Sequence, residues 1–280
     1  MTARLLDLSP AVSRFFLLAR LLILMSFGLE IGPSQAGQEI PQSKPHSGTL
    51  GHRPTLTAQW KYLGVEGPEH WSMLTPEYRT CEEGRQQSPI NITMTHHGHA
   101  PETLEFHYQT SELHELNNGH TIQVSHTSGC HVNLNHRRYQ LRQFHFHAPS
   151  EHHIEGKTFP MEMHLVHQDT QGHVLVIAIM LKIGAEEPVL QNLWTWLPKQ
   201  IGQEVSIPLS LSIADILPKH TRHFSYSGSL TTPPCTEGIQ WIVLEGPILI
   251  SQKDVDQFVD IIGHNARPIQ PLGNRHIDKR

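Results

Sequence analysis

The chain has 280 residues, of which 38% are hydrophobic and 17% charged, and its formal net charge is −5. This balance excludes an intrinsically disordered chain and a bundle of membrane helices. The charge is negative and no run of lysine and arginine occurs, so nothing favours nucleic-acid binding. We therefore expect one globular domain that acts on small molecules.

Residues 1–36 are typical of a signal peptide. Two arginines precede an apolar stretch whose uninterrupted core, residues 21–29, is too short to span a bilayer comfortably. Ser34 and Ala36 supply the small residues that predict cleavage before Gly37. We expect export, to the periplasm or outside the cell, with no stable membrane insertion after cleavage. A retained anchor is the alternative.

The remaining chain is predicted to be mainly β. Residues 37–59 carry proline, serine, glycine and histidine without periodicity, which predicts a flexible spacer. Alternating runs typical of strands follow at residues 121–125, 139–147, 161–167, 174–181 and 240–244. The apolar run 174–181 is long enough for a central strand that is buried on both faces. Helical patterns are fewer, and residues 187–197 and 252–262 are the best candidates.

One strand-like alternation predicts a metal site. Gln143, His145 and His147 occupy alternate positions, so they share one face of a strand. If a neighbouring strand carries Glu162 and His164, a third imidazole can meet the first two. Three neutral imidazoles around an open fourth position make a catalytic zinc site. Gln143 and Glu162 each precede a histidine by two residues, where they can accept the ring N–H that the metal does not use.

Many of the 23 histidines are expected to be surface or core residues of no catalytic interest, and His152 and His153 are counted among these. An alternating pair of histidines is a weak signal by itself, and the same-face polar partners strengthen it. The H-E-x-x-H pattern is absent from the sequence, so a helix-borne metalloprotease site is not supported. A metal buffer with flexible ligands at His46, His52 and residues 96–99 stays open as an alternative.

A series of ordered motifs runs from about Trp60 to Arg275. They are WKY (60–62), GPEHW (67–71), QSPINI (87–92), NNGH (117–120), QFHFHAPSEH (143–152), MEMHLVH (161–167), SLTTPPC (229–235) and NARP (265–268). Together they resemble the α-class carbonic anhydrases, most closely the exported bacterial branch. The resemblance implies a catalytic domain over residues 60–275 with a large, twisted, mostly antiparallel central sheet and short peripheral helices. Residues 276–280 are then a C-terminal tail.

The resemblance also implies a reaction, the reversible hydration of CO₂ to bicarbonate and a proton, with one Zn²⁺ per chain. Neutral ligands lower the pKa of a zinc-bound water to about 7, a magnitude characteristic of carbonic anhydrases themselves. In this family pattern Thr231 accepts the hydroxide proton and donates to Glu151, which orients the hydroxide. His120 is the proton shuttle.

The remaining implied site residues fall into four groups. The zinc ligands are His145, His147 and His164, supported by Gln143, Glu162 and the backbone carbonyl of Asn265, a role that the Asn265 side chain does not determine. The substrate pocket is Val166, Val176, Leu230, Thr232, Ile239 and Trp241, and the polar residues of the proton path are Tyr62, Asn118 and Gln123. The resemblance also implies a disulfide between Cys81 and Cys235.

Several alternatives stay open at this point. Cys130 is left over from the disulfide, either as a half-buried small hydrophobe or as a partner in an intermolecular bridge. A binding protein that had lost catalysis would usually lack a zinc histidine, and all three are present. A zinc esterase is the nearest enzymatic alternative, because the same hydroxide attacks activated esters. Both a monomer and a homodimer are compatible with the sequence.

Overall fold

The computed structural model describes residues 59–280, apart from 94, 98–101, 128 and 186–187. The expected signal peptide and all but the last residue of the expected spacer therefore lie outside the described residues. Within the described part, no helix is both long enough and apolar enough to cross a membrane.

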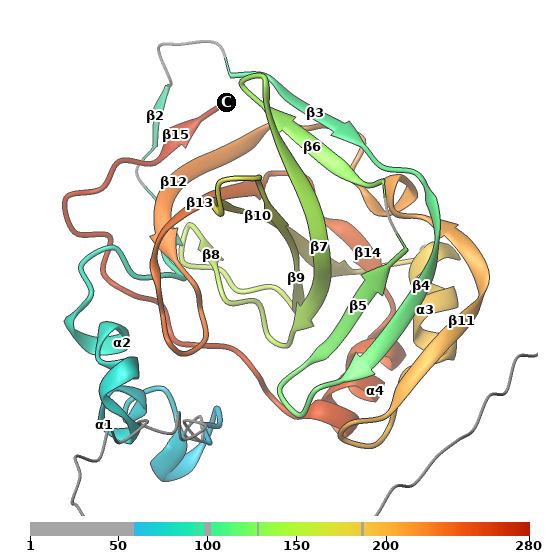
Figure 1. The fold of residues 1–280 in the computed structure, drawn as a ribbon, viewed down its shortest axis with the longest axis horizontal. Helices are drawn as coiled ribbons and strands as arrows, with labels where there is room; N and C mark the ends of the chain where they lie inside the picture. The colour runs from blue at the N-terminus through green and yellow to red at the C-terminus, as the bar shows by residue number, and fades with distance from the viewer. Residues whose placement is uncertain (1–58, 94, 98–101, 128, 186–187) are drawn as a thin grey trace, which may run out of the picture. The chain divides into compact units, whose positions relative to one another are not determined.

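A large twisted sheet of 13 strands dominates the described residues (Figure 1). Its main path runs in the spatial order β11 (Glu204–Ser212), β4 (Thr110–Asn117), β5 (Ile122–His126), β7 (Arg137–His147), β9 (Met161–Gln168), β10 (Val174–Ile183), β13 (Glu237–Leu244), β12 (His223–Ser229), β15 (Asp278–Lys279) and β2 (His96–His97). Strands β3 (Leu104–His107), β6 (His131–Leu134) and β14 (Ile248–Ile250) pair beside that path. A separate parallel pair joins β1 (Asn91–Ile92) to β8 (His153–Ile154).

Most neighbouring strands in the large sheet are antiparallel, as expected, and the parallel exceptions are β10 with β13, β10 with β14, and β15 with β2. The strands predicted from alternation are confirmed, with their ends moved by a few residues. The predicted central strand is β10, and it separates two apolar layers. Leu175, Ile177 and Ile179 face the main core, whereas Val176 and Ala178 face a smaller cluster on the other side.

The helices are short and peripheral. They are α1 (Trp71–Leu74), α2 (Thr80–Glu83), α3 (Pro188–Thr195) and α4 (Gln252–Ile262), with 3₁₀ turns η1 (Gly64–Glu66), η2 (Pro76–Tyr78) and η3 (Ile213–Ile216). The hydroxyl of Ser251 caps α4 by accepting from the Asp254 amide at 3.2 Å, and Gly263 ends the helix with a φ of 84°. The indole of Trp194 on α3 donates to the Asp254 carbonyl at 2.8 Å, which joins α3 to α4.

A β-bulge in β7 decides which side chains face the site. The register with β9 shifts between Leu141 and Gln143, so Arg142 is an extra residue. Before the bulge Leu141 points into the main core, and after it Phe144 and Phe146 do. One extra residue thus inverts the alternation, which turns Gln143 and the histidines that follow it away from the core.

The last five residues were expected to be a tail outside the domain, and the structure instead places a strand there. Asp278 and Lys279 form β15, which is antiparallel to β12 and parallel to β2. Ile277 is fully buried in the smaller apolar cluster. Two residues are too few to show a strand period, so only the tertiary pairing reveals this strand.

Candidate metal centre and active site

Strands β7 and β9 bring the three predicted zinc ligands together. His145 and His164 are direct cross-strand partners, and His147 follows on the same face of β7. The ring centroids of His147 and His164 are 4.5 Å apart, and those of His145 lie 5.0 Å from His147 and 5.3 Å from His164. One ring nitrogen from each histidine lies within 4.8 Å of the others.

Each of these histidines has one ring nitrogen bonded to an oxygen acceptor, so that nitrogen carries the proton. His145 Nδ1 donates to Gln143 Oε1 at 2.8 Å, His147 Nδ1 to the Asn265 carbonyl at 2.8 Å, and His164 Nε2 to Glu162 Oε1 at 2.7 Å. The opposite nitrogens therefore present lone pairs. His147 Nε2 is buried and has no hydrogen-bond partner among the described residues. This donor set fits a zinc ion, because the hydrogen bonds leave one unprotonated nitrogen on each of three rings whose nitrogens lie within 4.8 Å of one another.

Burial keeps two of the predicted ligands neutral. Removal from water is the main cause that lowers the pKa of His145 well below 6.5, and the neighbouring histidines lower it further. Burial also lowers the pKa of His147, against the opposing charge of Glu151. Both imidazoles are therefore neutral at neutral pH, as metal ligands must be.

His152 was counted among the histidines of no interest, and the structure makes it part of the site. Its fully buried ring donates from Nδ1 to Glu162 Oε1 at 2.6 Å and accepts at Nε2 from the Tyr226 hydroxyl at 2.6 Å. Tyr226 bonds in turn to Ser88 Oγ at 2.9 Å. This network fixes the Glu162 carboxylate against His164. His152 lies past the end of β7, where the strand period no longer predicts the direction of a side chain.

Glu151 and Thr231 are both buried, but the hydrogen bond that the resemblance implies between them is not formed. Glu151 Oε1 accepts from the Arg267 backbone amide at 2.8 Å. Glu151 Oε2 is buried and has no hydrogen-bond partner among the described residues. The carboxylate lies 3.6 Å from His147 Nδ1 and 3.9 Å from His164 Nδ1. Glu151 therefore sits beside the ligands with one oxygen still available.

Arg267 is a second residue that the sequence reasoning missed, although it belongs to the NARP motif. Its buried guanidinium donates to Gln87 Oε1, the Ser88 carbonyl and the Cys81 carbonyl at 2.9, 2.8 and 2.7 Å. Burial lowers the pKa of Arg267 to about 10, so it is still a cation at neutral pH. Its side chain thus holds the segment around Cys81, while its backbone holds Glu151.

The cysteines pair as the resemblance implies. Cys81 and Cys235 form a disulfide with their Cα atoms 4.9 Å apart. Cys130 is free and fully buried, and its sulfur contacts the backbone of Gln109. Full burial fits the small-hydrophobe alternative for Cys130 and leaves no accessible thiol for an intermolecular bridge.

The predicted substrate pocket lies in the smaller apolar cluster beside β10. Val176, Ile239 and Trp241 are buried members of the cluster, with Val166 and Leu230 packed against it. The Trp241 ring is 4.9 Å from that of His164, which places this apolar wall beside a predicted ligand. Thr232 is half-buried and follows Thr231 in the loop after β12.

His120 lies in the loop between β4 and β5. Its half-buried ring stacks on Trp60, with centroids 3.8 Å apart and an interplanar angle of 7°. Burial lowers the pKa of His120 below 6.5. Asn118, predicted on the proton path, uses its carboxamide oxygen to accept from the amides of His120 and Thr121, each at 2.9 Å. That oxygen shapes the turn that carries His120.

The other two residues of the predicted proton path are Tyr62 and Gln123. Tyr62 contacts Trp60 and Trp71 edge to face, and burial, helped by the charge of Glu151, raises the pKa of its hydroxyl well above 10. Tyr62 therefore stays protonated and can hold a water without titrating. Gln123 on β5 is the cross-strand partner of His145.

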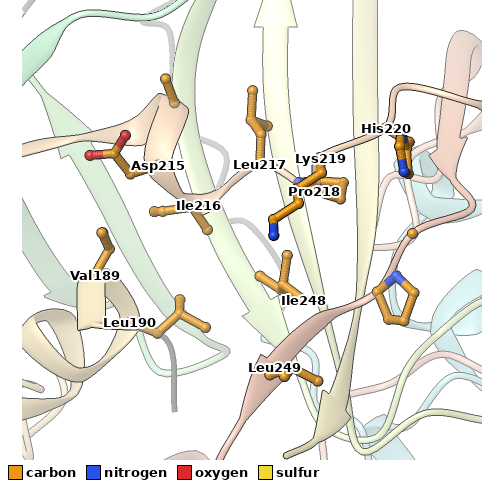
Figure 2. Close-up of a pocket in the computed structure, with 13 residues that line it drawn as sticks. Val189, Leu190, Asp215, Ile216, Leu217, Pro218, Lys219, His220, Ile248 and Leu249 are labelled. Carbon is orange, nitrogen blue, oxygen red and sulfur yellow. The ribbon is translucent and has the colours of Figure 1, made fainter. Parts of the chain in front are cut away.

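A separate cavity of about 550 Å³ is lined by residues of α3, η3 and β14 and of the segments beside them. Figure 2 shows its lining side chains. Leu190, Ile216 and Ile248 supply apolar walls, and Lys219 and His220 are among its polar residues. No predicted site residue lines this cavity. Among the described residues, neither group of possible metal ligands contains a residue that lines it. The candidate site is therefore the histidine centre.

Comparisons with known proteins agree with this geometry. Residues 66–280 match the sequence model of eukaryotic-type carbonic anhydrases. A carbonic anhydrase of Pectobacterium atrosepticum is 42% identical over 223 residues, which are 79% of this chain and 91% of that protein. A carbonic anhydrase of Nostoc sp. is 40% identical over 224 residues, covering 78% of this chain and 85% of that protein. The solved α-carbonic anhydrase from Thermovibrio ammonificans, in complex with the inhibitor sulfanilamide, has a TM-score of 0.76 at 40% identity, and the match covers 79% of this chain and 99% of that chain. The chain therefore belongs to the eukaryotic-type, or α-class, carbonic anhydrase family.

Proposed function

We propose that this carbonic anhydrase hydrates CO₂ at a single zinc ion held by His145, His147 and His164. The observation that carries the proposal is the set of hydrogen bonds that fix the tautomers of three clustered histidines and leave one unprotonated ring nitrogen on each. A zinc ion held there would supply hydroxide at neutral pH, because neutral ligands lower the pKa of a bound water to about 7, as is characteristic of carbonic anhydrases.

The residues around the ligands orient and shelter the reaction. Thr231 is suited to orient the hydroxide, since the free Oε2 of Glu151 is the acceptor that its hydroxyl requires. CO₂ is uncharged and a weak hydrogen-bond acceptor, so its site should be apolar. The wall that contains Val166, Val176 and Trp241 meets that requirement beside His164.

His120 is the proposed route by which the proton leaves. A water of pKa about 7 that releases its proton to bulk solvent is limited to roughly 10³ per second, because recapture cannot exceed a diffusion limit of about 10¹⁰ M⁻¹s⁻¹. Faster turnover requires a relay. With its lowered pKa, the His120 imidazole is neutral at pH 7 and free to accept a proton.

The metal assignment is tested by zinc titration of His164→Ala. We expect one tight zinc per chain in the parent protein, and a sharp loss of both zinc affinity and CO₂ hydration in the variant. His220→Ala, which changes an exposed histidine of the separate cavity, is the matched control and should alter neither. Full activity with one zinc per chain in His164→Ala would contradict the assignment. Several weak sites in the parent protein would favour a metal buffer.

The shuttle is tested by His120→Ala. In dilute buffer kcat should fall several-fold, while kcat/KM, which reports steps before proton export, changes little. Concentrated imidazole buffer should restore the lost rate. An unchanged kcat in dilute buffer would show that protons leave by another route.

Export to an oxidising compartment is the proposed localisation. The Cys81–Cys235 disulfide supports it, because such bridges persist outside the reducing cytoplasm. Cell fractionation and N-terminal sequencing provide the test, and the mature chain should start at Gly37. A chain that starts at Met1 in the membrane fraction would establish the retained anchor instead.

A further inference from the structure

The side chain of Asn265 joins the predicted shuttle loop to the strand that carries two predicted zinc ligands. Its Nδ2 donates to the His120 carbonyl at 3.0 Å and to the Phe146 carbonyl at 2.9 Å, and its Oδ1 accepts from the Ala148 amide at 2.8 Å. The residue is 1% exposed, so these bonds do not compete with solvent. Its backbone carbonyl separately accepts from His147 Nδ1.

We propose that the Asn265 side chain is a positioning residue for proton export, which holds His120 at a fixed place relative to the ligand His147. The inference rests on the proposed shuttle role of His120, and it adds a task to a residue that was expected to act through its backbone carbonyl alone.

The contacts of His120 give the first reason. Its ring is held from one side by Trp60, and its amide is bonded within its own loop to Asn118. Among the hydrogen bonds of the described residues, the one from Asn265 alone connects His120 itself to the end of β7. Thr121 Oγ1 also donates to the Phe146 carbonyl, at 2.6 Å, but that bond holds only the neighbouring residue. Proton relays through water depend on distance and direction, so this anchor matters for rate.

The chemistry of the carboxamide gives the second reason. Asn265 faces two carbonyl oxygens and one amide, and only a group with two donors and an acceptor satisfies all three. Aspartate keeps the acceptor for Ala148 but places an oxygen against both carbonyls. Because His147 is bonded to the backbone of Asn265, a side-chain substitution leaves that bond in place. Asn265→Asp should therefore loosen His120 more than it disturbs the metal centre.

Steady-state kinetics provide the test, with Thr121→Val as the matched control. This variant removes the bonds of Thr121 Oγ1 to the Phe146 carbonyl and amide, and it leaves the carbonyl of His120 bonded. For Asn265→Asp we expect kcat in dilute buffer to fall about 3- to 10-fold, with kcat/KM within twofold of the parent and the rate restored by imidazole. Thr121→Val should keep the parent kcat. In a His120→Ala background Asn265→Asp should cause no further loss of kcat, because the residue acts through His120. Equal losses in kcat and kcat/KM would overturn the inference.

A second readout uses the zinc-free protein and needs no turnover. Stacking on Trp60 should shift the His120 ring proton resonances upfield, and Asn265→Asp should reduce that shift while Thr121→Val retains it. An unaltered shift in Asn265→Asp would overturn the inference. If the variant does not fold, the wild-type amide protons of Asn265 can be measured, and they should exchange slowly because both are bonded. Rapid exchange of these protons would also overturn it.

The two proposals fail in different ways. If His120→Ala has the parent kcat, the shuttle itself is wrong. If His120→Ala is slow and Asn265→Asp is not, the shuttle stands and the positioning role of Asn265 is wrong.

Discussion

Glu115 gives this fold a large expected pH dependence of stability. It lies on β4 with Leu113 and Asn117 on the same inward face, and it is fully buried. Neither carboxylate oxygen has a hydrogen-bond partner among the described residues. Burial therefore raises the pKa of Glu115 from 4.5 to about 8. The folded protein holds this carboxyl in its neutral form at neutral pH.

The sign and size of the effect follow from proton linkage. The unfolded chain loses this proton near pH 4.5 and the folded chain only near pH 8. The contribution of the Glu115 carboxyl to the free energy of unfolding is therefore full below pH 4.5 and is lost as the pH rises to 8. At about 1.4 kcal/mol per pH unit, that interval corresponds to roughly 5 kcal/mol of unfolding free energy. Above pH 8 both states are ionised and the loss levels off.

The perturbation is Glu115→Gln, which preserves the shape of the side chain and cannot ionise. Urea unfolding of the zinc-free, oxidised protein at pH 5 to 9 gives the unfolding free energy of each variant. The advantage of Glu115→Gln over the parent should grow by about 1.4 kcal/mol per pH unit up to pH 8 and then stay constant. Glu112→Gln, which changes an exposed carboxylate on the opposite face of β4, should show no such slope. A constant difference between Glu115→Gln and the parent across the range would refute the reasoning.

Two further predictions concern the disulfide and the apolar wall. The Cys81–Cys235 bridge spans 154 residues of sequence, so replacing both cysteines by serine should cost up to about 5 kcal/mol of stability in the chain-entropy model, with zinc binding retained; an unchanged unfolding midpoint in urea would argue against this. Val166→Tyr should fill the space beside the apolar wall of the predicted substrate pocket. It should lower kcat/KM by at least about tenfold while one zinc per chain still binds. An unchanged kcat/KM would place the substrate elsewhere.

The sequence predicted that three histidines come together, because a strand period is a local property. His145, His147 and His164 lie at alternate positions on strands that are paired in the structure, and the residue two before His145 or His164 proved to be its hydrogen-bond partner. The alternation does not reveal the bulge at Arg142. The extra residue moves the later side chains of β7 to the opposite face, while the alternation after it continues unchanged.

The residues that were missed lie where no period operates. His152 and Arg267 follow the ends of regular elements, and their directions are set by partners far away in the sequence, such as Tyr226 and the Cys81 carbonyl. The stacking of Trp60 on His120 likewise joins two loops. Motif resemblance indicated that these segments mattered, but only tertiary packing shows which atoms meet.

The most direct test of the central claim is stopped-flow CO₂ hydration by the mature, oxidised protein before and after removal of its metal. We expect fast hydration by the metal-replete protein, its loss after dialysis against a chelator, and full recovery with one equivalent of Zn²⁺ per chain. Hydration that survives complete removal of the metal, or that needs several equivalents of zinc to return, would contradict the claim that His145, His147 and His164 form the one catalytic zinc site.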